Sequence, residues 1–179
     1  MKNENPVLSR KQIDHVMSLY TQGKFEEAIG QIKALNQSYP NVPLLFNLIG
    51  ACYREVGHLE GSIQMFKTAV QIKPNYAEAF FNLGFALKEK GNIDESIESY
   101  KKAILIQPNY PDAYNNLANI LKDDKKDLIE AIENLEWAVA YKSDFAEAHN
   151  NLGLALSDFG RAKDAIKSFE TAVKIKPDY

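Results

Sequence analysis

The sequence has little cysteine, no excess of positive charge and no long apolar run. Cys52 is its single cysteine, so the chain can form no internal disulfide and no cysteine-based metal site. The formal net charge of −3 disfavours a dedicated binder of nucleic acid or of anionic membranes, because such proteins normally carry a basic surplus. No apolar run reaches the roughly 18 residues that a membrane-spanning helix needs, so we expect no membrane insertion.

Signals for export and for catalysis are also missing. The opening MKNENPVLSR has no apolar core of a secretory signal peptide, and we expect a cytoplasmic protein. His15, His58 and His149 lie far apart, with no carboxylate or cysteine at ligand spacing, so the pattern predicts neither a metal site nor acid–base catalysis. No phosphate-binding loop, nucleophile elbow or carboxylate pair is present. We therefore expect no enzyme active site and no cofactor within these residues.

Internal repetition organises almost the whole sequence. Pro40, Pro74 and Pro108 recur every 34 residues, and two series of glycines follow the same spacing. A period of this length is typical of stacked helical units. The fourth unit has one extra residue, in or near 122–130, and lacks the glycine of the turn. After a lead of residues 1–8, the predicted units are 9–42, 43–76, 77–110, 111–145 and 146–179.

Each unit has the pattern of a helix, a turn and a second helix. In the third unit, 77–91 is the first helix and 92–106 the second. Gly91 suits the left-handed residue that closes a helix, and Asn92 suits the N-cap of the next one, with Glu95 three residues on. No β alternation of useful length is present. The sequence therefore predicts an all-α solenoid of five helix pairs, each packed on its neighbours.

The 34-residue unit has a signature of an aromatic residue at site four, Leu-Gly at seven and eight, Ala at twenty, an aromatic at twenty-four, Ala at twenty-seven and Pro at thirty-two. In the third unit these sites hold Phe80, Leu83, Gly84, Ser96, Tyr100, Ala103 and Pro108, with Ser in place of Ala. This signature resembles that of the tetratricopeptide repeat. The resemblance covers residues 9–179 and implies a right-handed α-solenoid that binds protein partners; the first unit matches it least.

Helical geometry separates two faces of each first helix. At about 100° per residue, sites 3, 4, 7, 8, 10 and 11 share the packing face, and sites 2, 5, 6, 9, 12 and 13 share the opposite arc. In the family that the chain resembles, this opposite arc lines the concave groove. The candidate groove residues are Asn47, Phe81, Asn115 and Asn150 at the fifth site, Asn82, Asn116 and Asn151 at the sixth, and Phe85 and Asn119 at the ninth.

These residues suggest a groove for an extended peptide. An asparagine amide has donors and an acceptor that can pair with peptide C=O and N–H groups, so a row of amides could hold a backbone of any sequence. Phe81 and Phe85 could anchor the peptide or could pack between repeats. The alternative for the asparagines is that they cap or hydrate an exposed face.

Two recognition modes known in the family place different demands on these sites. The sixth-site residues Asn82, Asn116 and Asn151 resemble the asparagine ladder of O-linked N-acetylglucosamine transferases, whereas Asp14 and Leu48 depart from it. The carboxylate clamp of chaperone-binding repeats needs basic residues at the second and sixth sites, with asparagines nearby. Here the second site holds Arg10 and Leu44 in the first two repeats, and then three acidic residues that would repel a carboxylate: Glu78, Asp112 and Glu147.

Several other side chains have simpler interpretations. Arg54, Lys88 and Lys122 share the twelfth site, and we expect them to form a solvated rim with weak ion pairs. Cys52 and His149 fall on packing faces and are expected in the core. Trp137 lies on a second helix, where it could be an exposed partner contact, although the insertion leaves its direction open.

Together these patterns predict a non-catalytic protein-interaction scaffold that binds an extended peptide or partner segment in its groove. Two alternatives stay open. The chain could be the substrate-recruiting N-terminal arm of a larger transferase that continues beyond residue 179. It could also self-assemble through its last helix, because no extra polar helix follows to cover the final apolar face.

Overall fold

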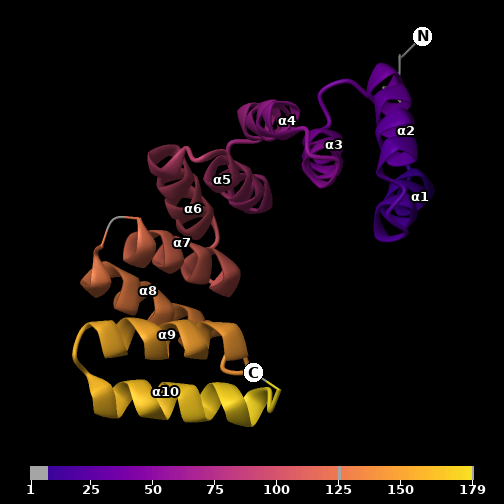
Figure 1. Cartoon of the computed structure of the whole chain (residues 1–179). Coiled ribbons are helices and arrows are strands. Elements are labelled where there is room, and N and C mark those ends of the chain that lie inside the picture. The colour runs from indigo at the N-terminus through magenta and orange to yellow at the C-terminus, as the bar shows by residue number, and fades with distance from the viewer. Residues whose placement is uncertain (1–7, 125, 179) are drawn as a thin grey trace. The chain divides into compact units, whose positions relative to one another are not determined.

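The computed structural model describes residues 8–124 and 126–178, so the predicted lead 1–8 lies outside the described residues except for Leu8. Within these ranges the chain forms ten α-helices and no strand (Figure 1). This confirms the predicted all-α fold class. The helices are α1 Arg10–Thr21, α2 Phe25–Ser38, α3 Pro43–Glu55, α4 Leu59–Ile72, α5 Ala77–Lys90, α6 Ile93–Ile106, α7 Pro111–Asp123, α8 Leu128–Tyr141, α9 Ala146–Asp158 and α10 Ala162–Ile175.

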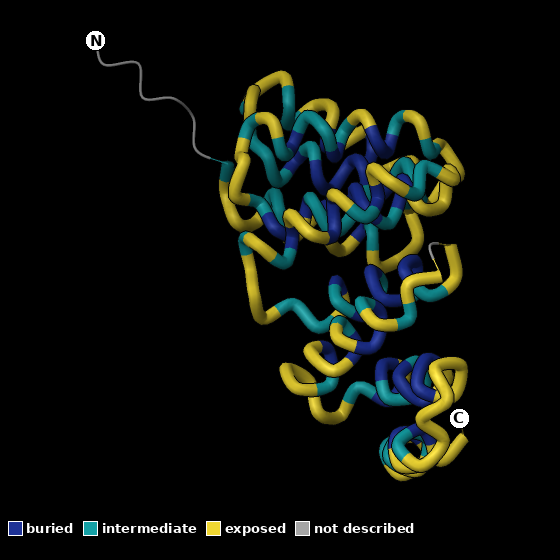
Figure 2. Tube along the Cα trace, turned by 90° about the vertical axis from the view of Figure 1, so that its left-hand side faces the viewer, coloured by how far each residue is buried: buried dark blue, intermediate teal, exposed yellow. Residues whose placement is uncertain are grey.

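The helices form two compact units, one through Gly91 and one from Asn92 onward. From this point "unit" means one of these two parts, and the 34-residue segments are called repeats. In the first unit, α1 to α5 pack each on the next, and α3 also touches α5. In the second unit, α6 to α10 do the same, and α7 also touches α9. Each unit thus has the neighbour-on-neighbour packing of an α-solenoid. The buried stretches, dark blue in Figure 2, lie between neighbouring helices within each unit.

The core of each unit joins an aromatic ring to a glycine of the preceding helix. Phe66 of α4 is fully buried against Gly50 of α3, where an added Cβ would lie 2.8 Å from the ring. Phe169 of α10 packs on Gly153 of α9, where the same distance would be 2.5 Å. The glycine at the eighth site therefore lets the ring of the second helix approach the backbone of the first.

The turn within four of the helix pairs uses a left-handed glycine. Gly23, Gly57, Gly91 and Gly160 have φ between 73° and 87°. After Gly57, the His58 N–H bonds back five residues to the Tyr53 carbonyl oxygen over 2.8 Å. This is the hydrogen bond that closes a Schellman-type helix end. The predicted role of Gly91 is confirmed, with φ of 85°.

The fourth pair closes its turn without glycine. Lys126 takes the left-handed conformation there, with φ of 56°. The next N–H, of Asp127, bonds to the Leu121 carbonyl oxygen over 2.9 Å, which is six residues back instead of five. The extra residue of this repeat therefore lies within 122–126, inside the segment that the spacing indicates.

The sequence prediction for Asn92 was only partly right. Asn92 occupies the N-cap position of α6, but its side chain makes no capping hydrogen bond to the helix backbone. Its amide nitrogen donates instead to Glu95 Oε1 over 3.0 Å. The N-cap backbone, with ψ of 70°, departs from the extended conformation that usually aims the side chain at the first turn.

Candidate functional site

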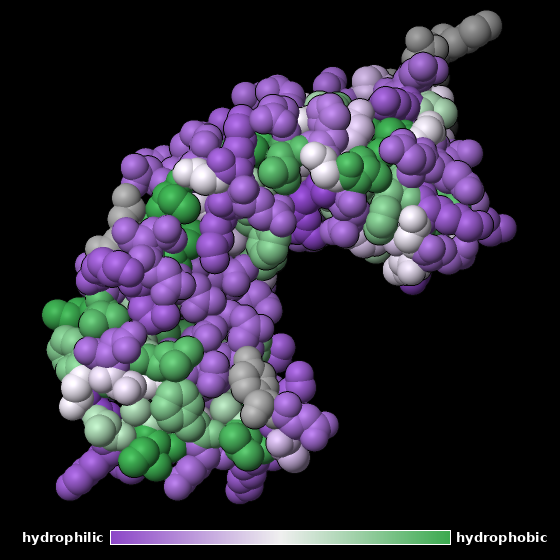
Figure 3. Space-filling view, viewed as in Figure 1, coloured by the Kyte–Doolittle hydropathy of each residue, from purple (hydrophilic) through white to green (hydrophobic). Residues whose placement is uncertain are grey.

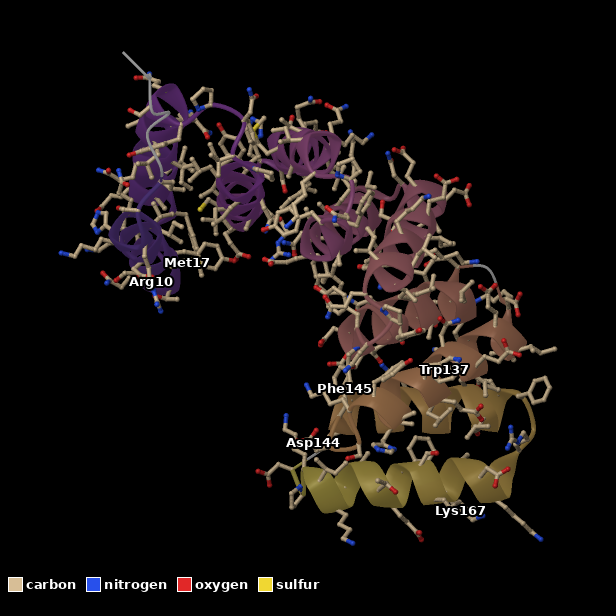
Figure 4. All side chains as sticks on the ribbon, turned by 180° about the vertical axis from the view of Figure 1, so that it is seen from behind. Arg10, Met17, Trp137, Asp144, Phe145 and Lys167 are labelled. Carbon is tan, nitrogen blue, oxygen red and sulfur yellow. The ribbon has the colours of Figure 1, made fainter. Side chains whose placement is uncertain are left out.

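In the first unit, the first helices of three repeats line a shallow cavity of about 200 Å³. Every lining residue occupies one of the sites that helical geometry places on the arc opposite the packing face. Met17 extends from α1 and is labelled in Figure 4. The lining residues are Met17 and Tyr20 of α1, Asn47, Leu48, Ala51 and Arg54 of α3, and Glu78 and Asn82 of α5.

A hydrogen-bonded group of amides forms the polar wall of this cavity. The Asn82 amide nitrogen donates to Asn47 Oδ1 over 3.0 Å. The Asn47 amide nitrogen donates in turn to Glu78 Oε1 over 3.0 Å and to the Tyr76 hydroxyl over 3.4 Å. Asn47 is only 2% exposed, so its burial depends on these partners. Burial and the nearby Glu78 carboxylate raise the pKa of Tyr76 to about 12, and the Tyr76 hydroxyl stays protonated at neutral pH.

The second unit repeats the same arrangement. The Asn151 amide nitrogen donates to Asn115 Oδ1 over 2.9 Å, and the Asn115 amide nitrogen donates to Glu147 Oε1 over 3.0 Å. Asn115 is 1% exposed. We call this arrangement the amide bracket: a fifth-site asparagine bonded to the second-site glutamate and the sixth-site asparagine of the following repeat. The fifth site of the third repeat holds Phe81, which has no amide to form a bracket.

The bracket corrects one expectation about the fifth site. Helical geometry placed the fifth-site asparagines on an exposed arc, but Asn47 and Asn115 are buried. The reason is that the following repeat covers this site, which a single helix and its partner do not reveal. Asn150, at the fifth site of the last repeat, is half-buried.

The sixth-site amides keep hydrogen-bonding capacity. Asn82 and Asn151 are half-buried, and each bracket bond uses one of their two N–H donors. The carbonyl oxygen Oδ1 and the second N–H of each side chain take no part in the bracket. Asn116 and Asn119, on α7, are also half-buried.

Arg54 forms the other wall of the cavity. Its guanidinium lies over the Phe85 ring at 4.7 Å, and its Nη2 contacts Glu55 Oε1 at 2.5 Å. The Tyr20 hydroxyl donates to the same carboxylate over 3.4 Å. With its side chain only 24% exposed, Arg54 is not the solvated rim residue that the charge pattern indicated. Its site shares the arc of the fifth and ninth sites, and this spacing could have predicted its place.

Phe81 is half-buried on α5, as is Phe85. Phe85 faces Arg54, so part of its ring is already occupied by a cation–π contact. The structure therefore brings together Asn47, Asn82 and the Arg54–Phe85 pair in the first unit. It brings together Asn115 and Asn151 in the second.

The residues expected in the core differ in their burial. Cys52 is 1% exposed, and burial raises the pKa of its thiol to about 11, so it is protonated at neutral pH. His149 is half-buried, with its Nε2 3.0 Å from the Ser143 carbonyl oxygen. Trp137, whose direction the sequence left open, has an exposed fraction of 53% and points away from the core.

Comparisons with known proteins agree with this architecture. A family model described as "TPR repeat" matches residues 50–91 and 86–125, and one described as "Tetratricopeptide repeat" matches residues 123–179. The chain belongs to the tetratricopeptide-repeat family. No match is found among the curated proteins. None of the helices in the described part of this tetratricopeptide-repeat chain is long and apolar enough to cross a membrane.

Solved structures of the same fold span nearly the full length of the chain. A crystal structure of MamA is 25% identical, with a TM-score of 0.81 over 97% of this chain and 98% of that chain. A second crystal structure of MamA protein is 27% identical, with a TM-score of 0.79 over 93% and 90%. YrrB, described as a TPR protein with an unusual peptide-binding site, is 17% identical, with a TM-score of 0.75 over 99% and 90%. The repeat fold of this chain is that of a protein-interaction scaffold.

Proposed function

We propose that the first-helix cavity of the first unit binds an extended peptide segment of a partner protein. The observation that carries this proposal is the amide bracket, which fixes Asn82 at the cavity wall with an acceptor and a donor still to satisfy. A peptide C=O and N–H supply the complementary pair. Asn151 has the same arrangement in the second unit, and Asn116 is the remaining candidate rung.

The bracket divides the candidate asparagines into two roles. Asn47 and Asn115 are buried supports that orient the sixth-site amides, whereas Asn82 and Asn151 present polar groups to a ligand. A side chain held by a hydrogen bond loses less rotamer entropy when a ligand binds. Pre-orientation therefore raises the affinity that each rung can contribute.

The cavity also supports side-chain contacts. Met17, Leu48 and Ala51 offer apolar surface, and Arg54 and Glu78 offer one charge of each sign. One neutral hydrogen bond contributes only about 1 kcal/mol, so affinity in the micromolar range requires apolar burial as well. We expect a ligand with an apolar side chain over Met17 and its backbone along Asn82. Phe81, Asn119 and Asn150 extend the candidate surface on neighbouring turns.

The test separates backbone recognition from other binding. Extended ten-residue peptides selected on the intact chain are compared with copies in which single backbone nitrogens are methylated. One methylation should weaken binding by about fivefold, since it removes one hydrogen bond. Asn82→Ala should lower the affinity for the unmethylated peptide by a similar factor. In this variant, the methylation that weakened binding to the original chain should have no further effect. Gln37→Ala, which removes an exposed amide of α2, should leave the affinity unchanged. If methylation at every position costs the same in both proteins, the Asn82 contact does not exist.

We also propose self-association through α10 as a second function, because this helix presents an apolar face. Ile166 is 56% exposed and Val173 is 49% exposed. They flank a cavity of about 510 Å³ on α10, and Figure 3 shows hydrophobic surface in this region. Sedimentation should show a concentration-dependent dimer that Val173→Glu abolishes. A monomer at all concentrations would exclude this function. The interpretation as a transferase arm stays a prediction.

A further inference from the structure

Helix α8 carries an exposed tryptophan that belongs neither to the core nor to the groove. Trp137 is 53% exposed, and it stacks on Tyr141 with ring centroids 5.7 Å apart and planes 23° apart. Tyr141 stacks in turn on Tyr114 of α7, at 5.9 Å and 26°. The indole is therefore held in one orientation by a stack of three rings, while much of its surface meets solvent. Figure 4 labels Trp137 on this helix.

Two glutamates share a surface cavity with this indole. Glu133, Glu136, Trp137 and Ala140 line a shallow cavity of about 330 Å³. Spacings of three and four residues place these side chains on one face of α8, which we call the Trp137 face. The sequence of α8, LIEAIENLEWAVAY, contains glutamates and no lysine or arginine. The helix thus joins an aromatic surface to negative charge without a cation of its own.

Arg161, a cation that the described part of the chain places beside this face, is engaged elsewhere. Its Nη1 lies 4.0 Å from Glu136 Oε1, at the limit of an ion pair. The same guanidinium donates to Asp164 Oδ2 through Nε at 3.0 Å and Nη2 at 2.9 Å. This two-point contact is the stronger one, because it is shorter and charge-assisted at both donors. Glu136 therefore has only a long contact with Arg161, and its carboxylate stays accessible to another partner.

We propose that the Trp137 face binds an arginine side chain in a basic segment of a partner protein. A guanidinium can stack on the indole and reach Glu133 and Glu136 with its edge N–H groups. An apolar helix is a poor occupant, because it would remove two carboxylates from water without pairing them. Lysine fits less well, since its ammonium cannot stack and donate in one plane. This site lies on a second helix, so it is separate from the first-helix groove proposed above.

The chain offers a direct reporter for this site, because Trp137 is its only tryptophan. The probe is the blocked peptide Ac-Gly-Arg-Gly-Arg-Gly-amide, titrated into the intact chain at about 0.15 M salt. Its matched control replaces arginine by citrulline, which keeps the shape and removes the charge. The arginine peptide should change Trp137 emission saturably, and the citrulline peptide should not. Equal responses to both peptides, or no response to either, would overturn the proposal.

Matched variants separate this site from general attraction between opposite charges. The double change Glu133→Gln with Glu136→Gln should lower the affinity for the arginine peptide by about tenfold. Glu26→Gln with Glu27→Gln, both exposed on α2, makes the same change in net charge and should leave the affinity unchanged. Calorimetry should show that Trp137→Phe lowers the affinity for the arginine peptide by about fivefold, since phenylalanine is the weaker cation–π partner. If the α2 variant weakens binding as much as the α8 variant, the attraction is not site-specific and the proposal is wrong.

Discussion

The Asn82 side chain donates a hydrogen bond to Asn47 Oδ1 over 3.0 Å, although the two residues are 35 positions apart in the chain. The contact joins equivalent helices of successive repeats. It recurs with Asn151 and Asn115 in the second unit, at 2.9 Å. The same side chains therefore stabilise the stacking of repeats and shape the surface that we propose for ligands.

Removing the buried member of a bracket should destabilise the chain. Asn47→Ala deletes hydrogen bonds to Glu78 and Asn82 and leaves a small cavity, so we expect the free energy of unfolding to fall by about 2 kcal/mol. Asn150→Ala is the matched control, because this fifth-site residue is only half-buried; it should cost under about 0.5 kcal/mol. Urea denaturation measures both.

A double-mutant cycle tests whether the bracket itself is responsible. Asn47→Ala combined with Asn82→Ala should cost about 1 kcal/mol less than the sum of the single changes, because each single change already breaks the shared bond. Strict additivity would show that the two amides do not stabilise each other.

Two glycine-to-alanine changes should have opposite effects on stability. A Cβ at Gly50 would lie 2.8 Å from the buried Phe66 ring, whereas a Cβ at Gly30 of α2 meets nothing within 4 Å. Gly50→Ala should therefore cost about 1–3 kcal/mol through overpacking. Gly30→Ala should gain about 0.5–1 kcal/mol, because alanine is the better helix former. If thermal unfolding shows that both variants gain stability, or that both lose it, this packing is contradicted.

A glycine in the turn of the fourth repeat should make the chain more stable. Lys126 adopts φ of 56°, a conformation that costs a residue with a side chain about 1 kcal/mol. Lys126→Gly should therefore raise the free energy of unfolding by about that amount, despite the added flexibility of the unfolded chain. Gly91→Ala makes the reverse change at an equivalent turn, where φ is 85°, and should cost a similar amount. Chemical denaturation of the two variants checks the pair.

Much of this architecture could be predicted from the sequence because the signals are local and repeated. The turn glycines and the period of 34 indicate helix pairs, and the left-handed φ of Gly91 confirms the role its place predicts. Gly50 with Phe66 and Gly153 with Phe169 place a ring on a glycine in both units. Backbone conformation and nearest-neighbour packing depend on residues within one repeat, so a single repeat shows them.

The arrangement of the site depends on contacts between repeats, and the sequence showed less of it. The angular position of Asn47 on its own helix indicates exposure, but α5 of the next repeat covers it with Glu78 and Asn82. Arg54 has the sequence pattern of a solvated charge, yet it packs on Phe85 from the following repeat. Trp137 follows an insertion, which shifts the register needed to assign its face. For Asn47 and Arg54 the decisive partner lies about one repeat away.

The stability of the first unit should fall at alkaline pH through Cys52. Burial raises the pKa of this thiol from 9.0 to about 11, so the folded state favours the protonated form. Stability from this group is fully present below pH 9 and is lost as pH rises toward 11, because only the unfolded chain releases the proton easily. The loss at pH 10 should be about 1 kcal/mol relative to pH 8. Tyr76, whose pKa is about 12, adds a further loss above pH 10. Urea titrations at pH 8 and pH 10 measure this loss, and in Cys52→Ala most of it should disappear. If the loss between the two pH values is unchanged in Cys52→Ala, other groups cause it.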